Sequence, residues 1–279
     1  MKKTYTLLII IFLLNSSISI FSQQEYYTGF KPAPKEELEK VKPFEEGKFR
    51  GEIKSSLDMS KDFPPVGNQG KLMSCVAWSL AYVLSYYNHS SHASYYTSAN
   101  ETDCNSIYSP AFIYNSLNYC TNGGILYTDA LAFVKEYGIV NLCEMPYDTS
   151  DYCTLPTIEQ YNKASLNRIH EFYSARGVVN SKMLKEKLNE GFPILIGVYV
   201  DNAFITKYKS NETTNYIWGG YKDRDLYGHA MIIVGYDNDK SAFKVMNSWG
   251  TSWGENGFIW ISYYFIPYCT IEAYYIDQN

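Results

Sequence analysis

One cysteine of this 279-residue sequence, Cys75, stands where its side chain could act as a nucleophile. Cys75 follows the loop Gly67-Asn68-Gln69-Gly70 and opens a stretch with helical spacing of apolar residues. A helix N-terminus carries partial positive charge, which favours a thiolate over a thiol. The pattern therefore predicts that Cys75 is a nucleophile, with an inert, packed thiol as the alternative.

A histidine and an asparagine are placed to complete such a nucleophile. His229 stands immediately before a predicted strand, and Asn247 ends the return strand after a hairpin. Because adjacent antiparallel strands bring the start of one beside the end of the next, the two side chains are expected to meet. The amide would hold one imidazole nitrogen and leave the other facing the cysteine, as in a Cys-His-Asn triad.

The other three histidines do not form a metal site in this interpretation. His89 and His92 lie in the polar stretch 89–105, which we expect to be a loop, and no further ligands accompany them. His170 is isolated and is expected to be structural. The sequence therefore predicts no metal and no cofactor.

The elements that must position these residues divide the chain into two halves. Helical periodicity covers residues 75–87, 111–118, 128–137 and 181–189. Strand patterns cover 193–200, 230–236, 242–246, 257–262 and 273–276, with a hairpin turn at 237–240. These patterns predict an α+β fold with a helical lobe at about 70–170 and a β-rich lobe at about 178–279.

The N-terminus has the features of an export signal. Lys2 and Lys3 precede the apolar run Leu7 to Leu14, and small residues follow, which predicts a signal peptide over residues 1–22. The run is too short for a membrane span of about 20 residues. We therefore expect a secreted, periplasmic or extracellular protein, whose cysteines can pair.

Residues 23–56 form a charged N-terminal segment. The part from 31 to 50 is predicted to be solvated, with one short helix around 36–41 and no contribution to the core. It is either a linker or a short pro-segment.

Composition excludes several classes of protein. The hydrophobic share of 46% and the aromatic share of 17% exclude a disordered chain or a coiled coil. The formal net charge is −5, and loss of Lys2 and Lys3 would make it −7. No positive excess is available to neutralise phosphates, so nucleic acid is not expected as a partner.

Four blocks in the same order resemble the papain-like cysteine peptidases, over roughly residues 63–276. They are Gln69-Gly70 with Cys75 and Ala77-Trp78-Ser79, Asn122-Gly123-Gly124, Gly228-His229-Ala230, and Asn247-Ser248-Trp249-Gly250. The resemblance implies a peptidase domain over residues 57–279. It also implies a β-barrel-like C-terminal lobe, with the active-site cleft between that lobe and the helical one.

The resemblance implies a role for each matching residue. Cys75 would attack the peptide carbonyl as a thiolate and His229 would protonate the leaving amine. The Gln69 side chain and the Cys75 N–H would hold the oxyanion. Asn247 would orient the histidine and Trp249 would shield their hydrogen bond. Gly123 and Gly124 would bind substrate by pairing with its backbone. Tyr274, which is assigned from its spacing after Cys269, would lie at the base of the pocket for the residue preceding the scissile one.

The cysteines depart from the family pattern. Leu72 stands where the family has a disulfide cysteine, so that bridge is absent. A Cys120–Cys153 bridge is implied, with Cys143 as a competing partner for either. Cys104 and Cys269 are unassigned, and at least one cysteine besides Cys75 is unpaired in a monomer.

The resemblance implies a secreted cysteine endopeptidase that acts on polypeptides. A proteinaceous inhibitor is a further expected partner, no membrane is expected after signal cleavage, and the chain is expected to be a monomer. Endopeptidase is preferred to exopeptidase because no histidine-bearing insertion follows Asn122. The alternatives are a catalytically impaired, peptidase-like binding protein and a thiol acyl transferase or ligase.

Overall fold

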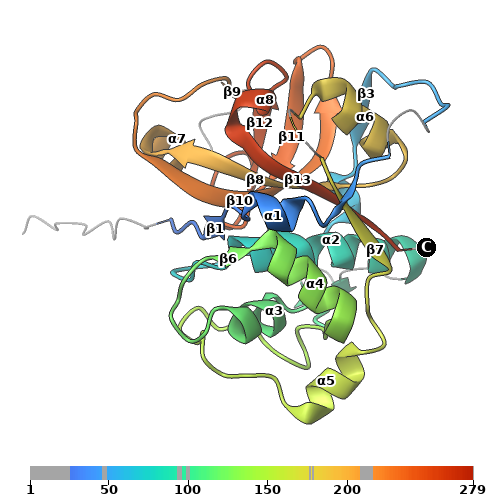
Figure 1. The fold of residues 1–279 in the computed structure, drawn as a ribbon, viewed down its shortest axis with the longest axis vertical. Coiled ribbons are helices and arrows are strands. Elements are labelled where there is room, and N and C mark those ends of the chain that lie inside the picture. The colour runs from blue at the N-terminus through green and yellow to red at the C-terminus, as the bar shows by residue number, and fades with distance from the viewer. Residues whose placement is uncertain are drawn as a thin grey trace, which may run out of the picture.

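The computed structural model describes residues 26–45, 49–92, 96–98, 101–175, 177, 179–207 and 216–278 (Figure 1). The predicted signal peptide lies outside these ranges. Within them, no helix combines the length and the apolar character that crossing a membrane requires.

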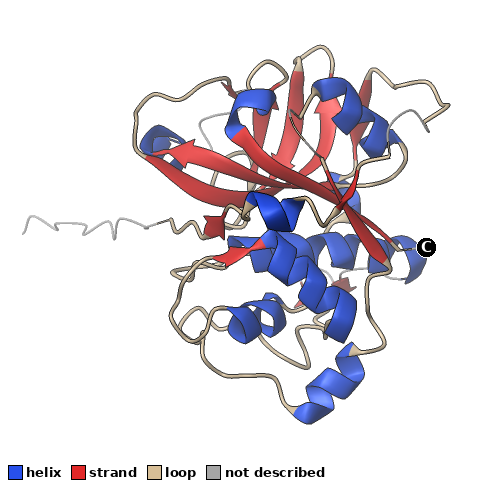
Figure 2. Cartoon of the chain, in the orientation of Figure 1, coloured by secondary structure: helices blue, strands red, loops and turns tan. Residues whose placement is uncertain are grey.

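The helical lobe occupies one side of the molecule (Figure 2). Its helices are α2 (Cys75–His92), α3 (Pro110–Leu117), α4 (Tyr127–Tyr137) and α5 (Ile158–Ala164). Local sequence explains several boundaries. Ser109 accepts a hydrogen bond from the Phe112 N–H and so caps α3, which has Pro110 in its first turn. Gly138, with φ of 81°, ends α4.

The β-rich lobe contains one nine-stranded sheet with the order β2-β7-β13-β8-β10-β11-β12-β9, in which β2 is Lys42–Pro43, and β3 (Ser56–Asp58) pairs with β10. Its main strands are β7 (Glu171–Ser174), β8 (Ile194–Asp201), β9 (Ile217–Trp218), β10 (Leu226–Asp237), β11 (Ala242–Met246), β12 (Phe258–Ser262) and β13 (Thr270–Asp277). Helices α6 (Ser181–Asn189), α7 (Asn202–Lys207) and α8 (Ile266–Cys269) belong to the same half of the chain. The fold is therefore two-lobed α+β as predicted, but the pairing of the strands does not close the sheet into a barrel.

The N-terminal segment joins both lobes. It contains β1 (Phe30–Lys31), α1 (Lys35–Leu38) and β2 (Lys42–Pro43), and it leads into β3 (Ser56–Asp58) and the 3-10 helix η1 (Ser60–Asp62). Strand β1 pairs in parallel with β6 (Ile125–Leu126) of the helical lobe, whereas β2 pairs with β7 of the large sheet.

The prediction that residues 31–50 contribute nothing to the core is wrong. Val41 and Phe44 are buried, and the Phe44 ring packs edge-on against Tyr275 with centroids 4.9 Å apart. Their apolar surface is isolated among charged residues in the sequence, so no periodicity revealed it.

Two local expectations also need correction. His229 lies inside β10, because pairing with β8 begins already at Leu226 and Asp201. The stretch 89–105 is not all loop, since α2 continues to His92 and a two-stranded sheet forms from β4 (Tyr96–Ser98) and β5 (Glu101–Thr102).

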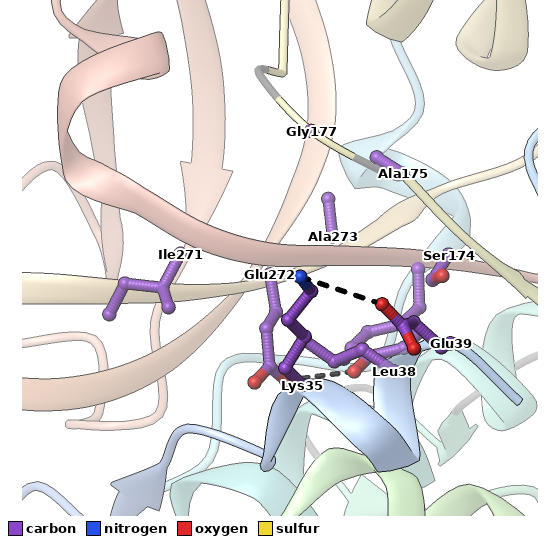
Figure 3. Close-up of a pocket in the computed structure, with 10 residues that line it drawn as sticks. Lys35, Leu38, Glu39, Ser174, Ala175, Gly177, Ile271, Glu272 and Ala273 are labelled. Atoms are coloured by element: carbon purple, nitrogen blue, oxygen red, sulfur yellow. Dashed lines mark hydrogen bonds and ion pairs between the residues drawn. The ribbon is translucent and has the colours of Figure 1, made fainter. Parts of the chain in front are cut away.

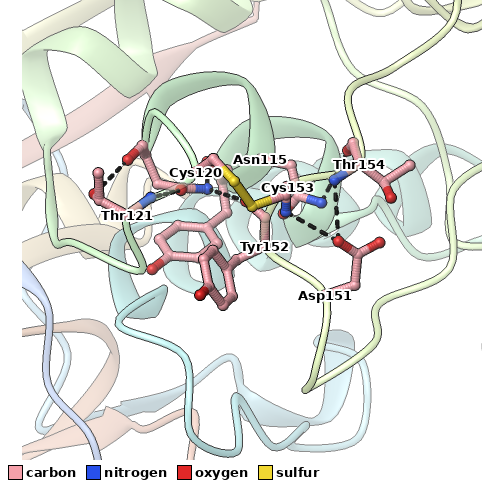
Figure 4. The surroundings of a disulfide bond; sticks show 9 residues. Asn115, Cys120, Thr121, Asp151, Tyr152, Cys153 and Thr154 are labelled. Carbon is pink, nitrogen blue, oxygen red and sulfur yellow. Dashed lines mark hydrogen bonds between the residues drawn. A yellow bond between two sulfur atoms is a disulfide. The ribbon is translucent and has the colours of Figure 1, made fainter.

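Two disulfides stabilise the helical lobe. Cys120 pairs with Cys153, as the family resemblance implied, and Cys104 pairs with Cys143. Figure 4 shows the first bridge beside Asp151, whose carboxylate accepts hydrogen bonds from the N–H groups of Cys153 and Thr154. This bridge fixes the loop that leads into Asn122-Gly123-Gly124. Cys75 and Cys269 are free and buried.

Candidate active site

Cys75 is the first residue of α2 and is fully buried. The segment before it is fixed by Asn122, whose Oδ1 accepts a hydrogen bond from the Met73 N–H at 3.1 Å. Asn122 Oδ1 also accepts from the Tyr114 hydroxyl at 2.8 Å. The cysteine therefore sits at a helix N-terminus on a backbone that is tied to the glycine-containing loop.

His229 and Asn247 meet across the β10–β11 hairpin. His229 Nε2 lies 2.7 Å from Asn247 Oδ1, which also accepts from the Ser248 N–H at 2.7 Å. The second hydrogen bond identifies the oxygen of the amide, so Nε2 is the protonated nitrogen and donates. His229 Nδ1 has no hydrogen-bond partner among the described residues. It is the nitrogen left free to exchange a proton with a nucleophile.

Trp249 covers this hydrogen bond. Its ring stacks on the imidazole with centroids 4.4 Å apart and an interplanar angle of 23°. The indole is almost completely buried. This arrangement excludes water from the His229–Asn247 contact.

Gln69 has its amide orientation set by neighbouring groups. Its Oε1 accepts from the Ser248 hydroxyl at 2.6 Å, which turns Nε2 to the opposite side. The Gln69 N–H donates to the Ser248 carbonyl at 2.8 Å, so the loop is also joined to the asparagine segment through the backbone. All four residues predicted from the sequence to be catalytic are therefore buried at the junction of the two lobes.

The N-terminal segment lies across these residues, which the sequence did not predict. We call residues 26–33 the strap. The carbonyl of Tyr27 accepts hydrogen bonds from Gln69 Nε2 at 3.0 Å and from Trp249 Nε1 at 2.9 Å. The Tyr26 ring packs against Trp249 with centroids 5.0 Å apart. A strap carbonyl thus occupies the donor that we assigned to the oxyanion.

The middle of the strap passes between the lobes. Gly29 donates its N–H to the Gly228 carbonyl, and its own carbonyl accepts from the Ile125 N–H, both at 3.1 Å. A Cβ atom at Gly29 would overlap the Met73 backbone, and one at Gly124 would overlap the Gly29 carbonyl. These glycines permit an approach of backbone to backbone that any side chain would prevent.

Phe30 is the main side chain that anchors the strap. It is 4% exposed and packs against the Tyr127 ring, with centroids 5.8 Å apart. Tyr127 in turn packs against Tyr274, with centroids 5.4 Å apart. Tyr274 is thus buried next to the ring that lines the pocket of Phe30. Gly123 lies beside Gly124 in the same loop.

Burial controls the charge of the Cys75 thiol and the His229 imidazole. Burial raises the pKa of the Cys75 thiol to about 12, although hydrogen bonding by the backbone of Ala230, Val76 and Phe30 lowers it in part. Burial lowers the pKa of His229 to about 4, against the opposing effect of Asn247. With the strap in place, both groups are therefore neutral at pH 7.

Comparison with known proteins identifies the family. The model of the papain family of cysteine proteases matches residues 53–277. The chain belongs to this family. The match includes the four candidate catalytic residues but begins after the strap.

Curated relatives are distant and longer. The chain is 30% identical over 150 residues to cathepsin C of Schistosoma mansoni, covering 49% of this chain and 32% of that one. It is 27% identical over 221 residues to cathepsin K of Mus musculus, covering 75% of this chain and 60% of that one. It is 24% identical over 218 residues to an uncharacterized peptidase C1-like protein of Acanthamoeba polyphaga mimivirus, covering 76% of this chain and 66% of that one. The chain therefore spans less than two thirds of the length of each of these relatives.

Solved structures share the fold. Xylellain, a cysteine protease from Xylella fastidiosa, has a TM-score of 0.74 at 20% identity, with 94% of this chain and 100% of that chain covered. The digestive procathepsin L 3 of the Tenebrio molitor larval midgut has a TM-score of 0.65 at 17% identity, with 90% and 75% covered. At these identities the likeness establishes the papain-like fold.

Proposed function

We propose that the chain is a cysteine endopeptidase in which Cys75, His229, Asn247 and Gln69 carry the reaction. The carrying observation is the fixed His229–Asn247 hydrogen bond, which leaves His229 Nδ1 free. His229 lies on β10, which packs against α2, and the backbone of the next residue, Ala230, forms a hydrogen bond with Cys75. Transfer of the Cys75 proton to Nδ1 produces a thiolate that attacks the peptide carbonyl. His229 then protonates the leaving amine, and water hydrolyses the thioester.

Gln69 is proposed to stabilise the oxyanion together with the Cys75 N–H. Its Nε2 already binds a carbonyl oxygen, that of Tyr27 in the strap. Because Ser248 holds the other end of the amide, the donor needs no reorganisation when charge develops on a substrate oxygen.

The strap makes this form of the chain latent. It occupies the Gln69 donor, it fills a pocket with Phe30, and it excludes water from the cysteine and the histidine. We therefore assign residues 26–33 to an inhibitory pro-segment, the second of the two possibilities open from the sequence. Its release would rehydrate both groups and allow the ion pair to form, with a bell-shaped dependence of rate on pH.

The proposed location is outside the cytoplasm. Two disulfides among the described residues suit an oxidising compartment, and the predicted signal peptide would direct export. The proposed substrates are polypeptides, the proposed further partner is a proteinaceous inhibitor, and the proposed state is a monomer.

Hydrolysis of casein or a fluorogenic peptide tests the proposal, with Cys75→Ala as the matched control. With the strap weakened by Phe30→Ala, the chain that keeps Cys75 should cleave after reduction of any oxidised thiol, and the same chain carrying Cys75→Ala should not. A peptidase-like binding protein would be favoured by two results together. Both chains would be equally inactive with the strap weakened, and tight peptide binding would survive Cys75→Ala. Condensation of the peptide with an added amine would favour a ligase.

A further inference from the structure

Asn122 holds the backbone that leads into Cys75 at two points. Its Oδ1 accepts a hydrogen bond from the Met73 N–H at 3.1 Å, and its Nδ2 donates to the Lys71 carbonyl at 3.3 Å. Among the described residues, no main-chain carbonyl accepts from the Met73 N–H, so this donor depends on side-chain acceptors. We call these two hydrogen bonds the clamp.

The amide of Asn122 is itself held in one orientation. Tyr114 is fully buried in α3, and its hydroxyl donates to the same Oδ1 at 2.8 Å. Two donors identify this atom as the amide oxygen, so the amide nitrogen has to face Lys71. A flipped amide would lose all three hydrogen bonds. The clamp therefore has a single geometry.

The turn that carries Asn122 has an unfavourable backbone conformation. Tyr119 and Cys120 both have φ of 56°, and Asn122 has φ of 47°. A residue with a Cβ atom loses roughly 1–2 kcal/mol in this left-handed region, although asparagine tolerates it better than most. The Tyr119 side chain is 87% exposed, so its packing does not offset this cost. The Cys120–Cys153 bridge fastens the turn instead (Figure 4), and backbone strain of this kind is typical of functional sites.

The clamp joins the two walls of a narrow slot. Gly124 lies two residues after Asn122, and Met73 lies two residues before Cys75. Gly29 of the strap runs between them, since a Cβ atom at Gly29 would overlap the Met73 carbonyl and one at Gly124 would overlap the Gly29 carbonyl. The fit is looser further along the N-terminal segment, where a cavity of about 310 Å³ separates α1 from β13 (Figure 3). The slot is therefore narrow where Asn122 ties one wall to the other.

Tyr147 fastens the flanks of the clamped backbone and not its middle. Its hydroxyl donates to the Gln69 carbonyl at 2.9 Å and lies 2.6 Å from Ser74 Oγ. The two disulfides join other parts of the helical lobe. Residues 71–73 therefore depend on Asn122 for their connection to the glycine-containing loop.

We propose that Asn122 is a positioning residue for the reaction, which couples the substrate-binding loop to the nucleophile. It sets the distance between a substrate backbone paired with Gly124 and the thiolate and N–H of Cys75. Attack requires the reacting atoms to be about 3–3.5 Å apart, and a misplacement of about 1 Å can cost about 10²-fold in rate. Without the clamp, the peptide carbonyl and the thiolate meet in this geometry less often. The inference rests on the proposed peptidase function.

The test uses the full chain carrying Phe30→Ala as the parent and adds one substitution at a time. Asn122→Gly removes the clamp and suits the positive φ. Asn122→Asp keeps the accepting oxygen and also tolerates this φ, but it loses the donor. The matched control is Ser241→Gly. Ser241 has φ of 50° and is exposed in the turn between β10 and β11, at the opposite end of that hairpin from His229.

Two measurements on these chains are compared with the parent. For a fluorogenic peptide, Asn122→Gly should lower kcat about 10- to 100-fold and change KM less than about threefold, because positioning acts on the chemical step. Asn122→Asp should lower kcat less than about tenfold, since it loses one hydrogen bond of three. Hydrogen exchange of the Met73 amide, resolved by mass spectrometry, should be at least about tenfold faster in Asn122→Gly and near the parental rate in Asn122→Asp. Ser241→Gly should match the parent in both measurements.

Three outcomes would overturn the inference. One is an Asn122→Gly chain with the parental kcat, whatever its exchange. Another is an Asn122→Asp chain with parental exchange at Met73 but a kcat lowered about 10²-fold, a result that does not depend on how well Asn122→Gly folds. The third is an equal fall in kcat for Ser241→Gly. A parent that cleaves no peptide would count against the peptidase proposal instead. The exchange of Met73 would then decide whether the clamp holds this backbone, with acceleration in Asn122→Gly in its favour and parental exchange against it.

Discussion

Truncation of Phe30 should open the cleft by a predictable amount. Phe30 is the large buried side chain of the strap, its backbone forms a hydrogen bond with Cys75, and burial of such a side chain contributes roughly 1.5–3 kcal/mol. Phe30→Ala should therefore shift the equilibrium between the closed and open strap by about 2 kcal/mol, which corresponds to about 30-fold in the open population.

The assay is the rate at which an alkylating reagent modifies Cys75, measured by mass spectrometry of the peptide that contains it. If opening is fast relative to alkylation, the rate is proportional to the open population and should rise about 30-fold. Cys269 is an internal reference in the same chain, because it is buried and its thiol bonds within α8, to the Ile266 carbonyl at 3.7 Å, so its labelling should not change.

Phe44→Ala is the matched control. Phe44 belongs to the same N-terminal segment and is equally buried, but it packs against Tyr275 rather than in the cleft. Its truncation should accelerate labelling of Cys75 far less than truncation of Phe30. Labelling of Phe30→Ala at the wild-type rate would refute the view that Phe30 anchors the strap, and equal acceleration by both variants would show that general destabilisation is responsible.

The remaining predictions concern charge and orientation. Because burial raises the pKa of Cys75 to about 12, the closed chain should show no ultraviolet absorbance of a thiolate between pH 7 and 10, taken as the difference between the wild type and Cys75→Ala, and its presence there would contradict a neutral thiol. Gln69→Ala should lower kcat of the opened chain by about 10²-fold with little change in KM, and an equal loss in KM would indicate a role in substrate binding instead. Burial favours a raised pKa for Glu171, but Lys135 and Lys42 hold it at about 2, below the ordinary 4.5. A lowered carboxyl pKa stabilises the fold above pH 4.5, and this stabilisation is lost as the pH falls toward 2. The urea midpoint of the wild type should therefore fall over that range more than that of Glu171→Gln, and parallel curves would be inconsistent with this role.

The sequence was informative where a local pattern has a single structural solution. Helix α6 and strand β11 match their predicted bounds, since each has clear periodicity and a turn at its end. The hairpin predicted between β10 and β11 brings His229 to Asn247 because strand pairing alone determines which residues lie opposite one another.

The strap could not be predicted in the same way. Its position depends on contacts with Gly124 and Gly228, which are distant in sequence, and on the burial of one aromatic residue in a charged segment. None of these relations has a periodicity or a motif of its own.

The account depends most on Cys75 being the nucleophile. The direct test of this assignment is titration of the Phe30→Ala chain with an irreversible thiol-directed epoxide. Peptide hydrolysis is measured in parallel, and the modified residue is mapped. Hydrolysis should fall linearly to zero as one equivalent is incorporated, all of it on Cys75. Full modification of Cys75 with hydrolysis retained, or loss of hydrolysis with the label on Cys269, would contradict the account.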